Sequence, residues 1–374
     1  MGSSSTQKMD WLIVFAVVPI IAAGLITMKS FTGSEAGFFG RQIIWVIVSF
    51  IAFFVASRID VRFLKRSNIA LGIYAIAVLF LVAVLIGGNV VNGAKSWFSF
   101  GAFSFQPSDV VKIALIMLLA KYYSRRHVEI RHVKHVIISG LYALVPLFLI
   151  FLEPDFGSAI IIFMIWLGMT LVSGISKKHL GVVFLMMLTA FGGLWFFVFK
   201  PYQKERIVNF LNPYYDIRGS GYNAYQSRIA VGSGGLLGKG VGFGTQSRLQ
   251  YLPEYQTDFI FAAFTEEWGF IGAMFLLILY GLLISRIIKA AFLGATNFET
   301  LFATGLTIML LSHILINVGM NIGIMPVTGI TLPFMSYGGS HLLVEFIALG
   351  LLMGMRRYSR AAHREDMGKE FIGI

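Results

Sequence analysis

The chain alternates long apolar runs with short polar connections, a pattern typical of a protein that crosses a membrane many times. A helix needs roughly 20 apolar residues to cross the hydrocarbon core of a bilayer. About ten runs approach that length, some of them with help from flanking residues or tilt. They lie near residues 11–28, 43–57, 69–86, 108–123, 136–152, 157–174, 180–199, 259–284, 300–323 and 342–355. The pattern predicts an all-α polytopic membrane protein, a bundle of about ten transmembrane helices.

The connections predict one membrane domain over residues 1–374, with a tail at each end, residues 1–10 and 356–374. Residues 1–5 are typical of an expression tag, and the first apolar run lacks a cleavage site, so we expect a retained helix. Only one connection is long, at residues 200–258, and it is rich in Gly, Asn, Tyr and Gln.

Within this long loop, residues 222–237 predict a helix that lies at the membrane interface. The candidate anchors of this helix are Tyr222, Tyr225, Ile229 and Leu236.

Composition agrees with the pattern, since 57% of the residues are hydrophobic, only 13% are charged, and the mean hydropathy is +0.79. These values exclude a soluble protein. The absence of cysteine excludes disulfides, thiolate metal sites and cysteine nucleophiles. In a soluble protein a net charge of +12 would raise nucleic acid as a partner, but in a membrane protein we expect it to be cytoplasmic loop charge.

The basic residues predict the orientation, because short cytoplasmic loops are enriched in Lys and Arg. One set of alternate connections holds 19 Lys and Arg, whereas the short connections of the other set hold 3. The 19 are Lys8, Arg58, Arg62, Lys65, Arg66, Lys121, Arg125, Arg126, Arg131, Lys134, Lys177, Lys178, Arg286, Lys289, Arg356, Arg357, Arg360, Arg364 and Lys369. Both termini are therefore expected in the cytoplasm, with residues 200–258 outside the cell, where nucleotide-activated substrates are absent.

Asp258 is the sharpest candidate for chemistry. It ends the polar run of the long loop and precedes the apolar Phe259, Ile260 and Phe261. A carboxylate there would be reachable from outside yet partly desolvated, which raises its pKa toward the range of a general base. The alternative is structural, because Asp and Thr are also good residues at a helix N-terminus.

Basic residues of the long loop are candidates for binding an anionic headgroup. Seven Lys and Arg, among them Arg206 and Lys239, stand against four Asp and Glu. Ordinary solvated charge and attraction to anionic lipid are the alternatives. Residues 232–240 resemble a phosphate-binding loop, but Ser233 takes the first glycine position and Gly240 replaces the Ser or Thr that would hold magnesium. We interpret these glycines as tight turns.

Lys112 lies one turn inside an apolar run and needs an internal partner. A carboxylate such as Asp155, in the short turn between two spans, or a bound phosphate would serve, so a structural ion pair and a ligand contact both remain open. His132 and His135 have the spacing of a metal pair but lie in a basic loop, and we expect no metal site there.

Several motifs together carry a resemblance that covers nearly the whole chain in order. They lie at residues 93–97, 105–112, 153–158, 221–227, 232–240, 252–262 and 326–340. By these motifs the chain resembles the SEDS family (shape, elongation, division and sporulation) of bacterial membrane proteins. Residues 244–249 favour its elongation branch, typified by RodA, over its division branch, typified by FtsW.

The resemblance implies a peptidoglycan glycosyltransferase of the bacterial cytoplasmic membrane that polymerises lipid II into glycan strands during cell elongation. It implies a class B penicillin-binding protein as partner, besides lipid II, the lipid-linked glycan and membrane lipids, and no nucleic acid. The essential acid of the family falls on Asp258. Residues implied to bind substrate are Lys112, Asp155, Arg206, Lys239 and Ser336.

The chemistry that follows from the resemblance is inversion at the anomeric carbon. Asp258 would accept the proton of the attacking hydroxyl, and basic residues, with or without a divalent cation such as Mg or Mn, would steady the pyrophosphate. Two other classes compete, a flippase for the same lipid-linked precursor and a non-catalytic scaffold for the penicillin-binding protein. A flippase needs acids or bases deep in the bundle, whereas the polar motifs here gather at the outer boundary.

Overall fold

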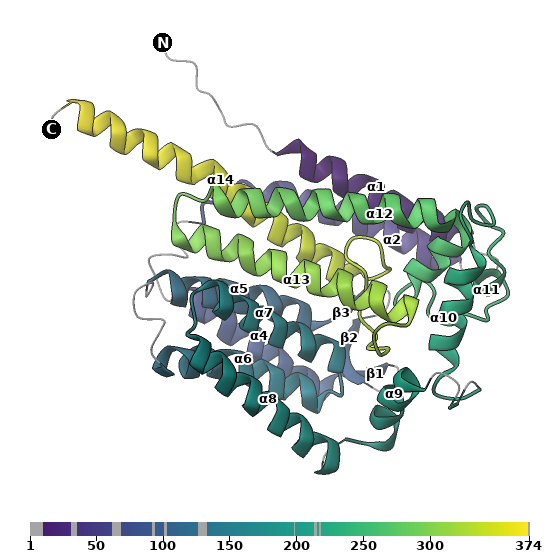
Figure 1. The fold of residues 1–374 in the computed structure, drawn as a ribbon. Helices are drawn as coiled ribbons and strands as arrows, with labels where there is room; N and C mark the ends of the chain where they lie inside the picture. Colours follow the sequence, from purple (N-terminus) through teal and green to yellow (C-terminus); the bar gives the residue numbers. More distant parts are fainter. Residues whose placement is uncertain are drawn as a thin grey trace.

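The computed structural model of the protein describes residues 10–30, 36–61, 69–91, 94–100, 103–125, 133–197, 199–212, 215–216 and 218–372. Each predicted apolar run coincides with a long helix, and Figure 1 shows these helices lying side by side in one bundle. They are α1 (Trp11–Ser30), α2 (Ala36–Ala56), α4 (Ile69–Gly87), α5 (Pro107–Ser124), α6 (Val133–Leu152), α7 (Phe156–Val172), α8 (Lys177–Phe197), α12 (Ile260–Phe292), α13 (Asn297–Ile322) and α14 (Gly339–Ile372).

The helices have the length and composition of membrane spans. In the described part of the chain, 8 are long and apolar enough to cross a bilayer. Of the other two, α7 has 17 residues and α5 carries the charged residues Asp109, Lys112 and Lys121. The predicted helical membrane bundle is confirmed. The predicted tail 356–374 continues α14 as far as Ile372, whereas residues 1–9 and 373–374 lie outside the described residues.

Burial within the bundle differs strongly from helix to helix. In α13, 72% of the membrane window is buried, whereas in α8 only 6% is buried. Helix α13 packs against α12, α5 and α7, so it forms the centre of the core. An apolar helix with an unburied surface is stable only against lipid, which places α8 on the periphery.

A small antiparallel sheet, which the apolar pattern did not predict, connects α4 to α5. Its strands are β1 (Asn89–Val91), β2 (Ala94–Phe100) and β3 (Phe103–Phe105), in the order β1-β2-β3. The Lys95 N–H donates to the Glu153 carbonyl at 3.3 Å, so the sheet lies against the turn between α6 and α7.

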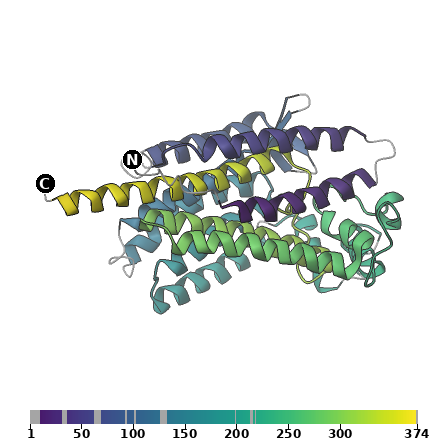
Figure 2. The same ribbon diagram turned by 90° about the horizontal axis from the view of Figure 1, so that it is seen from above.

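The long loop lies at one end of the bundle, as Figures 1 and 2 show, and its described residues form short helices. They are α9 (Pro201–Leu211), α10 (Tyr222–Ser233) and α11 (Thr245–Arg248). The helix predicted at 222–237 is present as α10, which packs on α12 and α13. Tyr222, Tyr225 and Ile229 are partly buried, whereas Leu236 just beyond α10 is 71% exposed.

Helix α12 is broken at Gly269, and the glycine-rich loop after α10 completes its hydrogen bonds. An unbroken helix would bond the Phe270 and Ile271 N–H groups to the carbonyls of Glu266 and Glu267. Instead, Phe270 donates to the Gly235 carbonyl at 2.9 Å and Ile271 to the Leu236 carbonyl at 3.1 Å. The freed carbonyls of Glu266 and Glu267 accept from the Lys239 and Gly240 N–H groups, both at 3.0 Å. Loop and helix thus exchange backbone bonds.

Residues 324–338 between α13 and α14 fold back into the bundle, and we call them the re-entrant segment. The Tyr280 hydroxyl donates to the Pro333 carbonyl at 2.6 Å, and the Tyr337 N–H donates to the Gln256 carbonyl at 2.8 Å. The segment is thereby fixed to α12 and to the turn that precedes it.

Candidate active site

Asp258 lies in the turn directly before α12 and is partly exposed. An added Cβ on Gly329 of the re-entrant segment would lie 3.4 Å from the Asp258 Oδ2 atom, so the carboxylate rests against this glycine. The carboxylate therefore stands at the meeting point of the α12 turn and the re-entrant segment, outside the membrane-spanning helices.

The surroundings of Asp258 raise its pKa to about 7. The main cause is burial, which disfavours the charged form, and the negative charges of Glu254 and Asp155 act in the same direction. The positive charge of Arg206 and a hydrogen bond from Thr257 oppose this shift. A carboxyl group with this pKa can accept a proton near neutral pH, as a general base must.

Asp155 caps helix α7. Its Oδ1 accepts the Ser158 N–H at 3.0 Å, and its Oδ2 accepts from the Gln106 side chain at 3.0 Å. The preceding Glu153 is fully buried, and burial together with the charge of Asp155 raises its pKa to about 8. Asp155 thus contributes negative charge that acts on Asp258, whereas its predicted contact with substrate is untested.

Arg206 lies on α9 with an exposed side chain. It lines a small cavity of about 30 Å³ together with Arg228 of α10, Met320 of α13 and part of the re-entrant segment, Met325, Pro326 and Val327. Arg228 packs over Gly323, where an added Cβ would meet the arginine Cγ and Cδ atoms. Two arginines therefore border one cavity on the Asp258 side of the loop.

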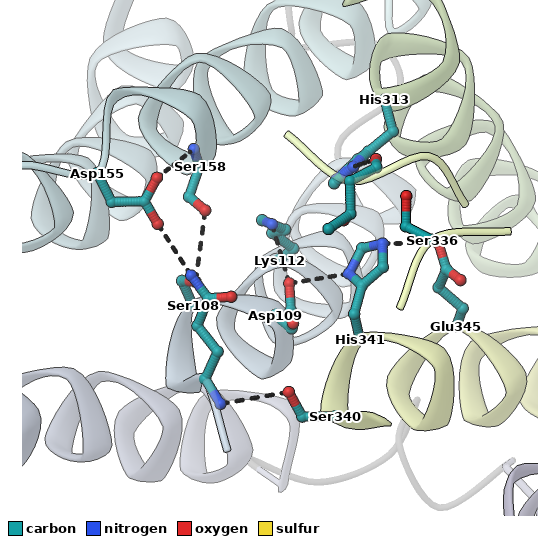
Figure 3. A network of polar contacts seen from close by, with 12 residues as sticks. Ser108, Asp109, Lys112, Asp155, Ser158, His313, Ser336, Ser340, His341 and Glu345 are labelled. Carbon is teal, nitrogen blue, oxygen red and sulfur yellow. Dashed lines mark hydrogen bonds and ion pairs between the residues drawn. The ribbon is translucent and has the colours of Figure 1, made fainter. Parts of the chain in front are cut away.

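Lys112 belongs to a buried cluster of charged groups, which Figure 3 shows together with Asp155 and Ser158. The Lys112 ammonium donates to Asp109 Oδ1 at 3.0 Å, and the His341 Nδ1 atom lies 3.1 Å from the same oxygen. The His341 Nε2 atom lies 3.0 Å from Glu345 Oε1, and Glu345 Oε2 accepts the Phe334 N–H at 3.0 Å. The cluster joins α5 to α14 and to the re-entrant segment.

Asp155, the carboxylate suggested as the partner of Lys112, does not form the ion pair. Its ion pair is with Asp109 on its own helix, one turn away, and Asp155 is engaged with Gln106 and Ser158. The Lys112 side chain is 4% exposed, and this ion pair offsets the unfavourable free energy of burying its charge in the bundle. Its contact with substrate stays a prediction.

Ser336 lies in the re-entrant segment and is buried. Its hydroxyl donates to the Thr257 carbonyl at 2.6 Å and accepts the Leu332 N–H at 2.8 Å. The structure therefore shows Ser336 fixing the residue next to Asp258, and its predicted contact with substrate is untested.

Lys239 is held by α12, two turns beyond Asp258. Its ammonium donates to Glu266 Oε1 at 2.7 Å and to the Thr245 hydroxyl at 2.9 Å. The Glu266 carboxylate is buried and also accepts the Gln246 N–H at 3.2 Å. This pair ties the glycine-rich loop to α12, and the predicted substrate contact of Lys239 is untested.

Within the described residues, no group of three or more His, Cys, Asp or Glu side chains has the arrangement of a metal site. Of the histidine pair in the basic loop, His132 lies outside the described residues, and His135 Nδ1 lies 2.8 Å from the Tyr122 hydroxyl. The divalent cation stays a prediction of the resemblance alone.

Two asparagines beside Asp258 were missed by the sequence reasoning. Asn317 and Asn321 of α13 are fully buried and donate to the Asp258 carbonyl at 2.9 Å and 3.0 Å. Two primary amides one turn apart in an apolar span were a signal that could have found them, because such groups are costly to bury without partners.

Comparison with known proteins agrees with this architecture. Residues 5–361 match the family of cell cycle proteins that comprises FtsW, RodA and SpoVE. The chain is 35% identical to the peptidoglycan glycosyltransferase MrdB of Escherichia coli K12, over 96% of this chain and 95% of that protein. It is 37% identical to the stage V sporulation protein E of Bacillus subtilis, over 94% of this chain and 98% of that protein.

Solved structures show the same fold. A chain of a peptidoglycan synthase complex, described as coordinating polymerization and crosslinking, superposes with a TM-score of 0.80 and 31% identity, covering 94% of this chain and 99% of that chain. The rod shape determining protein RodA of Thermus thermophilus superposes with a TM-score of 0.70 and 30% identity, covering 94% of this chain and 97% of that chain.

Proposed function

We propose that this chain, which belongs to the FtsW, RodA and SpoVE family of cell cycle proteins, polymerises lipid II with Asp258 as the general base. It is a multi-pass membrane protein, and its enzyme class is that of its curated relatives, peptidoglycan glycosyltransferase. The proposal adds the substrate, the catalytic residue and the face of the membrane.

One observation carries the proposal. Asp258 is a partly exposed carboxyl group with a pKa of about 7 at the loop end of the bundle, and it feels the positive charge of Arg206, which borders a cavity together with Arg228. A base of this strength, a neighbouring cationic site and access from outside the helices are the features that transfer to a hydroxyl acceptor requires.

In the proposed reaction, Asp258 takes the proton of the acceptor hydroxyl while that oxygen attacks the anomeric carbon of the donor. A carbon–oxygen bond to the acceptor forms, the bond from the anomeric carbon to the pyrophosphate breaks, and the configuration inverts. The pyrophosphate leaves as an anion, so the donor needs no separate general acid. Arg206 is placed to steady the negative charge that develops on this leaving group.

A lipid-linked donor fits the location of the site. The loop end of the bundle carries the Asp258 group, and the bulk of the chain consists of apolar helices that remain in the bilayer. We propose that this end faces outward from the bacterial cytoplasmic membrane, where a donor must arrive already activated, and that both termini are cytoplasmic.

We also propose a class B penicillin-binding protein as the partner, and elongation as the process. The solved peptidoglycan synthase complex supports the partner, because one of its chains shares this fold over almost the whole of both chains. The similarity to MrdB and to RodA supports elongation.

The test is polymerisation of purified lipid II by the wild-type protein and by Asp258→Asn, with the product strands separated by length. Asn retains shape and hydrogen bonding but cannot accept the proton, so we expect the rate to fall by a factor on the order of 10² or more. Thermal melting in detergent serves as the control for folding, and we expect it to be little changed, because the N-cap of α12 is Phe259 and not Asp258.

Three outcomes would count against the proposal. Strand synthesis by folded Asp258→Asn at the wild-type rate would show that the base is another residue. Failure of the purified wild type to polymerise lipid II, alone and with its penicillin-binding protein, would favour a scaffold. Transfer of lipid II across vesicle membranes without polymerisation would favour a flippase.

A further inference from the structure

Two asparagines of α13, Asn317 and Asn321, lie one helical turn apart in an apolar span and are both fully buried. A primary amide carries two donors and an acceptor, and burying them without hydrogen-bond partners is costly. Such a pair is therefore retained only where its hydrogen bonds are satisfied, and the partners show what it holds in place.

Both amides converge on one atom, the backbone carbonyl oxygen of Asp258. Asn317 Nδ2 donates to it at 2.9 Å and Asn321 Nδ2 at 3.0 Å. A carbonyl oxygen has two lone pairs, so the two amides use its full capacity. Two donors from fixed positions on a helix set the plane of the Asp258 peptide, and with it the direction of the Cα–Cβ bond.

The asparagine pair also takes over the first hydrogen bond of α12. In a regular helix the Ala262 N–H would donate to the Asp258 carbonyl four residues earlier. Here it donates to Asn321 Oδ1 at 3.1 Å, and the first regular bond runs from the Ala263 N–H to the Phe259 carbonyl at 3.1 Å. The Asn321 amide is inserted between Ala262 and Asp258, which keeps Asp258 out of the helix.

The other bonds of the pair reach the elements that surround the carboxylate. Asn317 Nδ2 donates to the Ile330 carbonyl at 2.7 Å, next to the glycine against which the Asp258 carboxylate rests. The Ser227 hydroxyl of α10 donates to the backbone carbonyl of Asn321 at 2.9 Å, and it lies 3.4 Å from the side-chain Oδ1 atom of the same residue. The turn before α12, the re-entrant segment and α10 therefore meet at these two side chains.

From this geometry we infer that Asn317 and Asn321 are positioning residues for glycosyl transfer, which hold the Asp258 carboxylate in its reactive orientation. The inference rests on the proposed role of Asp258 as the general base. A base that is misplaced by about 1 Å can cost a factor of 10² in rate, so loss of either amide should slow the chemical step more than it weakens substrate binding.

The experiment compares Asn317→Ala, Asn321→Ala and the wild type in steady-state polymerisation of lipid II by the purified full chain. We expect kcat to fall by a factor of about 10 to 100, while KM changes by less than about threefold. Asn317→Leu, which keeps the volume and removes the amide, repeats the measurement if an alanine variant does not fold.

The pH dependence of kcat/KM gives a second readout that lost stability alone would not move. In the wild type, burial raises the pKa of Asp258, as do Glu254 of the same turn and Asp155 at the N-cap of α7, and Arg206 of α9 lowers it. A carboxyl released from this partly desolvated place should ionise closer to its ordinary range. We therefore expect the acid limb of the profile to move to lower pH in the asparagine variants.

Thr307→Val is the matched control, because Thr307 is buried in the same helix and donates only to the Ala303 carbonyl of its own helix. It should keep wild-type kcat. Wild-type kcat in any folded asparagine variant would overturn the inference. So would an equal loss of kcat in Thr307→Val and in the asparagine variants when their melting temperatures fall by the same amount. Asp258→Asn is measured in parallel to separate the two proposals. Full activity of Asp258→Asn would refute Asp258 as the base. An inactive Asp258→Asn together with fully active asparagine variants would refute only the positioning role of the asparagines.

Discussion

At the scale of single residues, the pKa of Asp258 depends on burial and on a balance of neighbouring charges. Burial and Glu254 raise the pKa of this carboxyl, whereas Arg206 lowers it, and the result is a value of about 7. As the proposed general base, Asp258 would act in its ionised form, so activity should rise as the pH increases through this value and level off above it. The effects of Glu254 and Arg206 can therefore be tested by whether their removal shifts this rise in activity to lower or to higher pH.

Glu254→Gln and Arg206→Gln should shift the acid limb of the kcat/KM profile in opposite directions. Removal of the negative charge lets Asp258 ionise at lower pH, and removal of the positive charge makes ionisation require higher pH. For partly solvated pairs of 0.2–1 kcal/mol, each shift should be roughly 0.2–0.7 pH units.

The matched control is Arg248→Gln. Arg248 is an exposed arginine on α11 and is not among the groups that shift the pKa of Asp258. Its acid limb should coincide with that of the wild type. Shifts of the same sign in both test variants would mean that the limb reports a group other than Asp258.

At the scale of elements, the break in α12 divides the helix into two parts with different surroundings. Ile260–Glu267 are buried by the loop helices and by α13, whereas Trp268, Phe270 and Ile271 are 39%, 56% and 58% exposed. At 1.5 Å per residue, Phe270–Phe292 spans about 34 Å, close to the hydrocarbon thickness of about 30 Å. The portion beyond Gly269 is therefore the part that crosses the bilayer, and the first turns support the site.

Gly269→Ala should detach the glycine-rich loop from α12. Gly269 has φ 67°, in the left-handed region, and an added Cβ would meet the Gly238 nitrogen and the Leu236 carbonyl. We expect a loss of stability of several kcal/mol and faster proteolysis of residues 234–242, measured by thermal melting and limited digestion in detergent.

Gly281→Ala is the control on the same helix, because a Cβ added there would have nothing within 4 Å and the surface at this position is exposed. It should melt at or above the wild-type temperature. Equal melting of both variants would show that the exchange of backbone bonds at Gly269 contributes little to stability.

At the scale of the whole molecule, the two ends of the bundle differ in charge and in the elements that form them. The end opposite the loop helices joins the start of α1 to α12 and α14: Asp10 Oδ2 accepts from Arg286 at 2.7 Å and from Arg356 at 2.9 Å. Both arginines belong to the set of basic residues that predicts the cytoplasmic side. The tertiary structure thus gathers at one end the charges that the sequence distributes over separate connections.

Single cysteines can test this orientation, because the chain contains no cysteine of its own. With the loop end outside, a membrane-impermeant maleimide should label Arg248→Cys in intact spheroplasts and label Lys178→Cys only after permeabilisation. Both positions are exposed at the protein surface, so access across the membrane decides the difference. The reverse pattern of labelling would place the Asp258 site in the cytoplasm and contradict lipid-linked synthesis at the outer face.

The sequence by itself determined the helical bundle and the candidate base. Spans are set by the length of apolar runs, and a bilayer leaves few alternatives to helices, so each predicted run coincides with a helix. Asp258 could be identified because a carboxylate between a polar loop and an apolar run is exceptional in the linear pattern. The turn that carries Asp155 between α6 and α7 could be located for the same reason.

The tertiary structure alone decided which groups meet between helices. Lys112 pairs with Asp109 one turn away on the same helix, which helix spacing allows, whereas His341 reaches Asp109 only because α14 packs against α5. Asn317 and Asn321 reach the Asp258 carbonyl only because α13 packs against the start of α12, about 60 residues away in the chain. A linear pattern encodes burial and period, whereas the direction of a side chain depends on how helices pack, and that is a property of the assembled bundle.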